Sequence, residues 1–184
     1  MQEVIKDAED RMKKSIEAVT EELSSIRTGR ASTALFDKIK VDYYGAPTPL
    51  NQLATISVPE ARLVVIQPWD KGAMGEIEKA IQKSELSLNP NNDGKVIRIN
   101  IPPLTEERRK DYVKLAKEKA EQARVSVRNI RRDSLDTLKS LEKDGDISED
   151  ELKRYEDEMQ KLADKYVAKI NDLLESKEQE ILEI

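Results

Sequence analysis

The sequence contains no cysteine and no histidine. Without cysteine, disulfides and thiolate metal sites are excluded, and a reducing compartment is compatible with the chain. Without histidine, the chain lacks the commonest general base, the commonest metal ligand and the side chain that titrates near neutral pH. Catalysis by carboxylates or lysine stays open, so these absences argue against an enzyme without excluding one.

Long apolar runs are also missing. The longest aliphatic run in the β-rich part, residues 63–66, is far shorter than the roughly 20 residues that cross a bilayer. The first seven residues include Glu3 and Asp7 and form no apolar signal core. We therefore expect a soluble, cytoplasmic protein with no membrane partner.

Charge of one dominant sign is absent as well. Charged residues make up 38% of the chain, yet the formal net charge is only −5. Hydrophobic residues make up another 38%, and this combination is typical of long amphipathic helices that bury one narrow stripe. Any binding of nucleic acid must therefore come from a local basic patch rather than from the field of the whole protein.

Residues 31–103 differ in composition from the rest of the chain. All seven prolines and four of the six glycines lie there, so long helices are excluded from this stretch. We expect a small inserted β/α/β domain, in which Trp69 and the Tyr43–Tyr44 pair are packing aromatics. The expected elements are strands at 38–44, 54–58, 62–67 and 96–101, a helix between 70 and 84, and a turn at 89–94.

Apolar residues outside this stretch recur at steps of three and four. They predict one helix over residues 5–26, a second from about 105 to 143, and a third from about 149 to 181. Thr105 and Ser148 are the expected N-caps of the last two helices. None of the helices can bury its stripe alone. The fold predicted is therefore α+β with two domains: a long antiparallel three-helix bundle formed by residues 1–30 and 104–184, and the inserted domain.

The second long helix carries an arginine-rich stretch without acids. Arg124, Arg128 and Arg131 are spaced by four and three and share one face, with Arg132 beside them. Arginine contacts phosphate in a bidentate manner, and no aromatic residue is interleaved for base stacking, so structured RNA backbone is the favoured target. The alternative is a solvated basic face balanced by acids on neighbouring helices: residues 144–184 hold 14 acids and 6 bases, a net charge of −8.

Two short segments join the predicted domains. The first is Gly29, Arg30 and Ala31, and the second is Pro102, Pro103 and Leu104. Two domains that are joined by only two short connections can move about them as a hinge, and the proline pair restricts this motion. The alternative is a fixed angle set by a packed interface.

The sequence contains no complete motif for metal binding or catalysis. The segment that starts at Asp144 resembles a calcium loop at first, but Glu149 stands where the turn glycine is needed and Tyr155 where the closing glutamate is needed. We predict no catalytic residue, no metal site and no cofactor.

Five segments together resemble the bacterial ribosome recycling factor family over the whole chain. They are residues 27–32, 43–50, 88–91, 102–110 and 121–133. The resemblance implies an L-shaped molecule with a flexible corner. It also implies a monomer that binds the ribosome after termination and, with elongation factor G and GTP, promotes its disassembly into subunits and its release from mRNA.

The resemblance further implies which residues bind ribosomal RNA. Arg128 and Arg131 match the contacting positions in the large subunit at the A and P sites, and Arg27, Arg30, Arg124 and Arg132 lie close by in the motifs. Two other functions stay open on the residues alone. One is a helical adaptor that self-associates through its apolar stripes, and the other is a hydrolase that uses carboxylates.

Overall fold

The computed structural model describes residues 2–86 and 88–183, so the two end residues of the predicted bundle and Ser87 of the predicted inserted domain lie outside the described residues. The chain divides into two compact units. The helical unit consists of the described residues of Met1–Ile26 and Lys110–Leu182, and the small unit contains Arg27–Arg109. Each unit has its own hydrophobic core.

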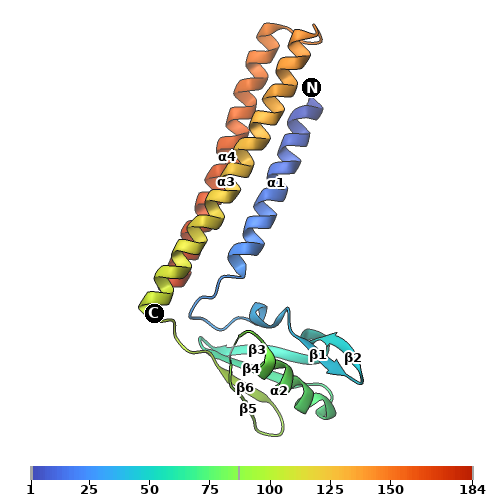
Figure 1. Cartoon of the computed structure of the whole chain (residues 1–184), viewed down its shortest axis with the longest axis vertical. Coiled ribbons are helices and arrows are strands. Elements are labelled where there is room, and N and C mark those ends of the chain that lie inside the picture. The colour runs from blue at the N-terminus through green and yellow to red at the C-terminus, as the bar shows by residue number, and fades with distance from the viewer. Residues whose placement is uncertain (1, 87, 184) are drawn as a thin grey trace. The chain divides into compact units, whose positions relative to one another are not determined.

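Three long helices build the helical unit. They are α1 (Gln2–Ser24), α3 (Glu106–Lys143) and α4 (Glu149–Leu182). In Figure 1, α1 and α4 run in the same direction and α3 runs antiparallel to both. This confirms the three helices and the antiparallel bundle that the apolar spacing predicts.

The core of the helical unit is one continuous seam between the three helices. The stripe predicted for α3 is buried from Ala116 to Leu138, and even Ser134 within it is only 5% exposed. Tyr166 and Met159 of α4 and Met12 of α1 close the seam from the other two helices. The apolar stripes of the three helices bury one another within one chain, so each helix depends on the other two for its burial.

Local sequence signals set the helix ends. Thr105 accepts a hydrogen bond from the Arg108 amide at 3.2 Å, and Ser148 accepts one from the Glu151 amide at 3.1 Å, as expected for N-caps. Gly145 ends α3 with φ +80°, and the amide of Asp146 after it bonds back to the Leu141 carbonyl at 2.9 Å. This tight turn makes α3 and α4 neighbours.

The small unit contains two sheets and one α-helix. A hairpin of β1 (Lys40–Tyr43) and β2 (Ala46–Pro49) forms the first sheet. The second sheet is antiparallel with the order β3-β4-β6-β5, and α2 (Met74–Lys83) supplies Ile77 and Ile81 to the core. Its strands are β3 (Ala54–Glu60), β4 (Leu63–Pro68), β5 (Pro90–Asn92) and β6 (Ile97–Asn100).

Some expectations for the small unit were wrong. β2 was missed because its two prolines argue against a strand, although prolines are tolerated in an edge strand. The turn expected at residues 89–94 begins with the short strand β5. Trp69 is 65% exposed and Tyr44 is 84% exposed, so neither is buried in the core, whereas Tyr43 packs against the core as predicted. Tyr44 lies at the tip of the β1–β2 hairpin with φ +50°, and its ring centroid lies 4.6 Å from that of Tyr43 in an edge-on contact.

The residues predicted as a hinge are held partly within the small unit. The Ala31 amide bonds to the Ala61 carbonyl at 2.7 Å, and Leu104 is 8% exposed. A side chain at Gly29 would lie 3.7 Å from the backbone nitrogen of Leu104, so the two predicted segments are close neighbours. Pro102 and Pro103 are exposed. Among the described residues, no helix combines the length and apolarity that a membrane span requires.

Candidate nucleic-acid interface

Contacts between the helices fix how α3 is rotated in its unit. Towards α1, Ser126 shares a 2.9 Å hydrogen bond with Ser15, and Asp133 lies 3.4 Å from Arg11. The opposite edge of α3 faces α4. The surface between these two edges points away from the core, and this surface carries Val125, which is 43% exposed.

The predicted arginines lie on and beside this outward surface. A hollow of about 350 Å³ runs along it and is lined only by residues of α3. The lining residues are Val125, Arg128, Asn129, Arg131, Arg132, Leu135, Asp136 and Lys139. The structure therefore brings three of the six predicted RNA-binding residues together in one shallow depression.

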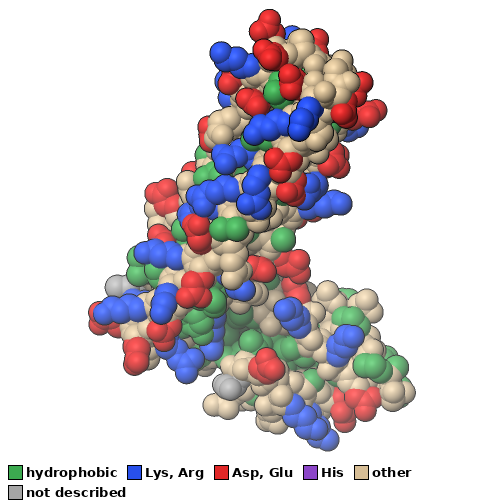
Figure 2. Space-filling model, turned by 45° about the horizontal axis from the view of Figure 1, so that its top comes forward, with side chains coloured by type: hydrophobic (Ala, Val, Ile, Leu, Met, Phe, Trp, Pro, Cys, Tyr) green, Lys and Arg blue, Asp and Glu red, His purple; other side chains and the backbone are tan. Residues whose placement is uncertain are grey.

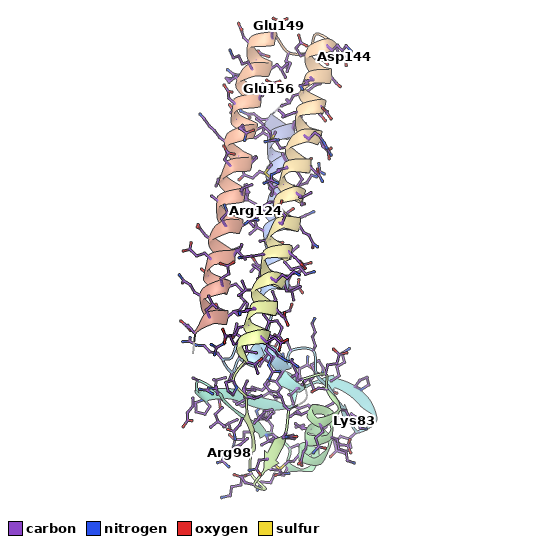
Figure 3. The ribbon with its side chains drawn as sticks, turned by 60° about the vertical axis from the view of Figure 1, so that its left-hand side comes forward. Lys83, Arg98, Arg124, Asp144, Glu149 and Glu156 are labelled. Carbon is purple, nitrogen blue, oxygen red and sulfur yellow. The ribbon has the colours of Figure 1, made fainter. Side chains whose placement is uncertain are left out.

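Arg124 and Arg131 reach towards α4. The Nε of Arg124 donates to Oδ1 of Asn171 at 2.8 Å, and Figure 3 labels this arginine where it extends towards α4. One terminal nitrogen of Arg131 donates to Oε1 of Gln160 at 2.9 Å. The side chains on α4 that hold these guanidinium groups are neutral amides, so both arginines keep their positive charge unneutralised by those contacts.

Arg128 and Arg132 are exposed. Arg132 donates to the side chain of Asn129 one turn before it, at 3.2 Å. Arg128 donates to Glu121 at 3.2 Å, and the same carboxylate accepts a 3.0 Å bond from Arg124 through its other oxygen. Glu121 thus bridges the half-exposed Arg128 and the largely covered Arg124, whose side chain is only 19% exposed.

The two arginines stabilise the ionised form of Glu121. The hydrogen bond from Arg124, followed by the one from Arg128, holds the pKa of the Glu121 carboxyl below its usual value. The arginine stripe therefore contains a stabilised negative charge.

The wider surface of the helical unit has mixed charge. On the face drawn in Figure 2, basic and acidic side chains alternate over the helices. This agrees with the small net charge of −5. A polyanion would therefore be drawn to the arginine stripe by local contacts, within about one Debye length, rather than by a long-range field.

Arg27 and Arg30 belong to the small unit, whereas the other four predicted arginines belong to α3. Arg27 is half-buried, and Arg30 lies 2.5 Å from the carboxylate of Glu183. Their role in RNA binding stays a prediction.

Sequence reasoning missed Glu121, Asn171 and Gln160. Glu121 was detectable, since it stands three residues before Arg124 and seven before Arg128, both spacings that share a helix face. The two amides on α4 carry no such signal, because the rotation of α4 against α3 cannot be derived from either helix alone.

Comparison with known proteins identifies the family. The family model for ribosome recycling factor matches residues 19–182. The chain belongs to the ribosome recycling factor family. The resemblance drawn from the five sequence segments is thereby confirmed.

Relatives of this family match the chain over its full length. The ribosome-recycling factor of Treponema denticola is 64% identical over 183 residues, which cover 100% of this chain and 99% of the relative. A solution structure of a ribosome recycling factor superposes with a TM-score of 0.79 at 50% identity, covering 100% of this chain and 97% of the other.

A third relative comes from a ribosomal complex. It belongs to models of the T. thermophilus ribosome recycling factor and the E. coli elongation factor G bound to the E. coli post-termination complex. This ribosome recycling factor is 52% identical, with a TM-score of 0.67 and coverage of 99% of this chain and 98% of the other.

Proposed function

We propose that this chain binds the post-termination ribosome and, with elongation factor G, promotes its disassembly into subunits and its release from mRNA. The observation that carries the proposal is family membership at 50–64% identity over essentially the whole length of the chain. GTP is hydrolysed by the partner, and the chain itself catalyses no step. As a ribosome-bound factor it works as a monomer in the cytoplasm.

The outward face of α3 is the proposed contact with large-subunit RNA at the A and P sites. Arg128 and Arg132 are exposed and, among the described residues, bond only to Glu121 and Asn129 of their own helix, and Arg131 lies beside them in the same hollow. Arginine makes charge-assisted hydrogen bonds to phosphate, which are about twice as strong as neutral ones. Arg124, Arg27 and Arg30 complete the proposed set.

The proposed mechanism needs a stiff helical unit and compliance between the units. The continuous seam supports stiffness, since α3 is 38 residues long and its buried stripe packs against two partner helices. Compliance is assigned to the joining segments: Gly29, Arg30 and Ala31 on one side, and Pro102, Pro103 and Leu104 on the other. The hydrogen bond of Ala31 and the burial of Leu104 favour a pivot at the ends of these segments nearest the helices.

The adaptor alternative loses its main support in this structure. It predicts self-association through the apolar stripes, but residues such as Tyr166, Leu138 and Met12 are at most 1% exposed within a single chain. A stripe that is already buried offers no surface to a second copy.

The test is ribosome splitting and co-sedimentation with the Arg131→Ala variant. We expect affinity for the ribosome to fall roughly tenfold, and the dependence of log affinity on log salt to become shallower by about 1, since one phosphate contact is lost. The rate of GTP-dependent ribosome splitting with elongation factor G should fall together with the affinity. Helicity measured by circular dichroism should be unchanged.

Two control variants separate charge from structure. Gln160→Ala removes the hydrogen bond that Arg131 makes to α4 but keeps the arginine charge. Lys153→Ala removes one positive charge from the exposed surface of α4. Both are expected to bind nearly as well as the unchanged protein. Unchanged binding by Arg131→Ala, or equal losses in all three variants, would contradict the proposed interface.

A further inference from the structure

Glu121 is a negative charge at the centre of a positive stripe. With about 100° per residue, Lys114, Lys117, Arg124, Arg128 and Arg132 fall within an arc of about 80° on α3, and Glu121 falls inside that arc. An RNA backbone lying on these cations would therefore approach this carboxylate closely.

The geometry around Glu121 is that of an occupied anion site. Its two oxygens accept from two different guanidinium groups, Arg124 at 3.0 Å and Arg128 at 3.2 Å. A phosphate presents the same arrangement, with anionic oxygens that accept from converging arginines. The carboxylate stands where one phosphate of a bound RNA would make the same contacts.

Glu121 is not needed to position Arg124. The hydrogen bond from the Nε of Arg124 to Asn171 already orients the Arg124 side chain, and 81% of that side chain is covered. Glu121 and Arg128 are about half-exposed, at 53% and 51%. Ion pairs between such exposed side chains contribute little to stability, so the carboxylate can move into solvent at little cost.

We propose that Glu121 is an internal competitor: in the free protein it fills the anion site between Arg124 and Arg128, and an RNA phosphate takes its place when the protein binds. The inference rests on the proposed contact between α3 and ribosomal RNA. Such an exchange lowers affinity for phosphate, and it therefore favours release of a factor that must leave its target after each round.

The first test measures binding of Glu121→Gln to purified large ribosomal subunits across a range of potassium chloride concentrations. The glutamine keeps the size and an acceptor oxygen but removes the charge. We expect binding about three- to tenfold tighter, because the ion pairs of Glu121 with Arg124 and Arg128 no longer oppose it. The dependence on salt becomes steeper, since the arginines now release counterions that Glu121 had replaced.

Glu118→Gln is the matched control. It removes the same charge from an exposed position one turn earlier on α3, outside the bridge to Arg124 and Arg128. A change in the long-range field alone would affect both variants equally, whereas the exchange predicts a gain for Glu121→Gln only. In the Arg128→Ala background, the gain from Glu121→Gln shrinks because half of the anion site is missing.

The second test uses inorganic phosphate and the free protein, so it does not depend on ribosome binding. Phosphate is titrated while the side-chain Nε–H signals of Arg124 and Arg128 are followed by nuclear magnetic resonance. Tighter phosphate binding by Glu121→Gln than by Glu118→Gln supports the exchange. Equal or weaker binding overturns it, because Glu121 would then be a support for the arginines.

The two tests fail in distinguishable ways. If the unchanged protein does not bind large subunits, the proposed function fails, while the phosphate titration still decides on the exchange. If it binds and Glu121→Gln is no tighter in either assay, only the exchange is overturned.

Discussion

In the helical unit, residues far apart in the chain meet, whereas the core of the small unit comes from one continuous segment of the chain. The hydroxyl of Tyr166 donates to Glu9 across 157 positions at 3.2 Å, and α1 packs on α4 although the whole small unit lies between them in sequence. In the small unit, the central pairing of β4 with β6 joins residues such as Leu63 and Asn100 within Arg27–Arg109. Each helix forms from local signals, but the bundle needs both ends of the chain.

The two separate cores suggest that damage to one unit leaves the other folded, and Trp69 makes this testable. It is the only tryptophan and lies in the small unit, where its Nε1 donates to Thr55 at 2.8 Å. Its fluorescence reports the small unit, while the circular dichroism signal of the long helices reports mainly the helical unit.

The largest expected effect comes from Leu138→Ala. Leu138 is fully buried in the seam, and such truncations cost about 2–5 kcal/mol through lost burial and the cavity left behind. We expect the urea midpoint of the helical signal to fall strongly while that of Trp69 fluorescence stays in place. Lys139→Ala, at the exposed next position, serves as the control. An equal shift of both midpoints would show that the two units unfold together, which would contradict their independence.

An intermediate effect is expected from Gly145→Ala. The φ of +80° at the end of α3 is unfavourable for any residue with a Cβ, and the substitution should cost the helical unit about 1–2 kcal/mol. Gly75→Ala in α2 is the counterpart in the small unit, since its added Cβ meets no atom within 4 Å and its φ is not positive. It should stabilise by up to about 1 kcal/mol. Urea unfolding is followed by circular dichroism and by Trp69 fluorescence. The midpoint of the helical signal should fall for Gly145→Ala, and the midpoint of the fluorescence should rise for Gly75→Ala.

The smallest effect concerns acid stability of the small unit. Hydrogen bonds from the Val96 and Lys95 amides, with Arg98 beside them, lower the pKa of Asp93 to about 2. Because the folded pKa lies below the unfolded value of 3.8, the stabilisation is present above pH 4 and is lost as pH falls towards 2.

Asp93→Asn should therefore lower the urea midpoint of Trp69 fluorescence at pH 7. The difference from the unchanged protein should shrink as pH falls from 4 towards 2, where about half of the aspartate is protonated. Glu85→Gln, which removes an exposed charge elsewhere in the small unit, should show no such trend. A difference as large at pH 2 as at pH 7 would mean that the side-chain charge is not its cause.

The contrast between the units also explains which parts of the fold followed from the sequence. The three helices, and the caps of the last two, were predicted because apolar spacing, Thr105, Ser148 and Gly145 all act over a few residues. β2 and β5 were missed because each has only three or four residues and contains proline, and their pairing partners, rather than their own sequences, make them strands.

The candidate interface was predicted in outline only. The spacing of Arg124, Arg128 and Arg131 correctly placed them on neighbouring positions of one helix. It could not separate the arginines held by α4 from the exposed ones, because that depends on where Asn171 and Gln160 lie on a different helix. Burial of Trp69 was predicted wrongly for a related reason: its size favours burial, but its place at the end of β4 exposes it.

The insertion of the small unit between α1 and α3 has a consequence during synthesis. Roughly 80 residues separate the end of α1 at Ser24 from the start of α3 at Glu106, which takes about 4 to 16 seconds at usual rates of elongation. The small unit can be completed in this interval, whereas the apolar stripe of α1 must wait for helices that have not yet been made. The first helix to emerge therefore waits longest for burial, and the nascent chain is most open to chaperones along Met12, Val19 and Leu23.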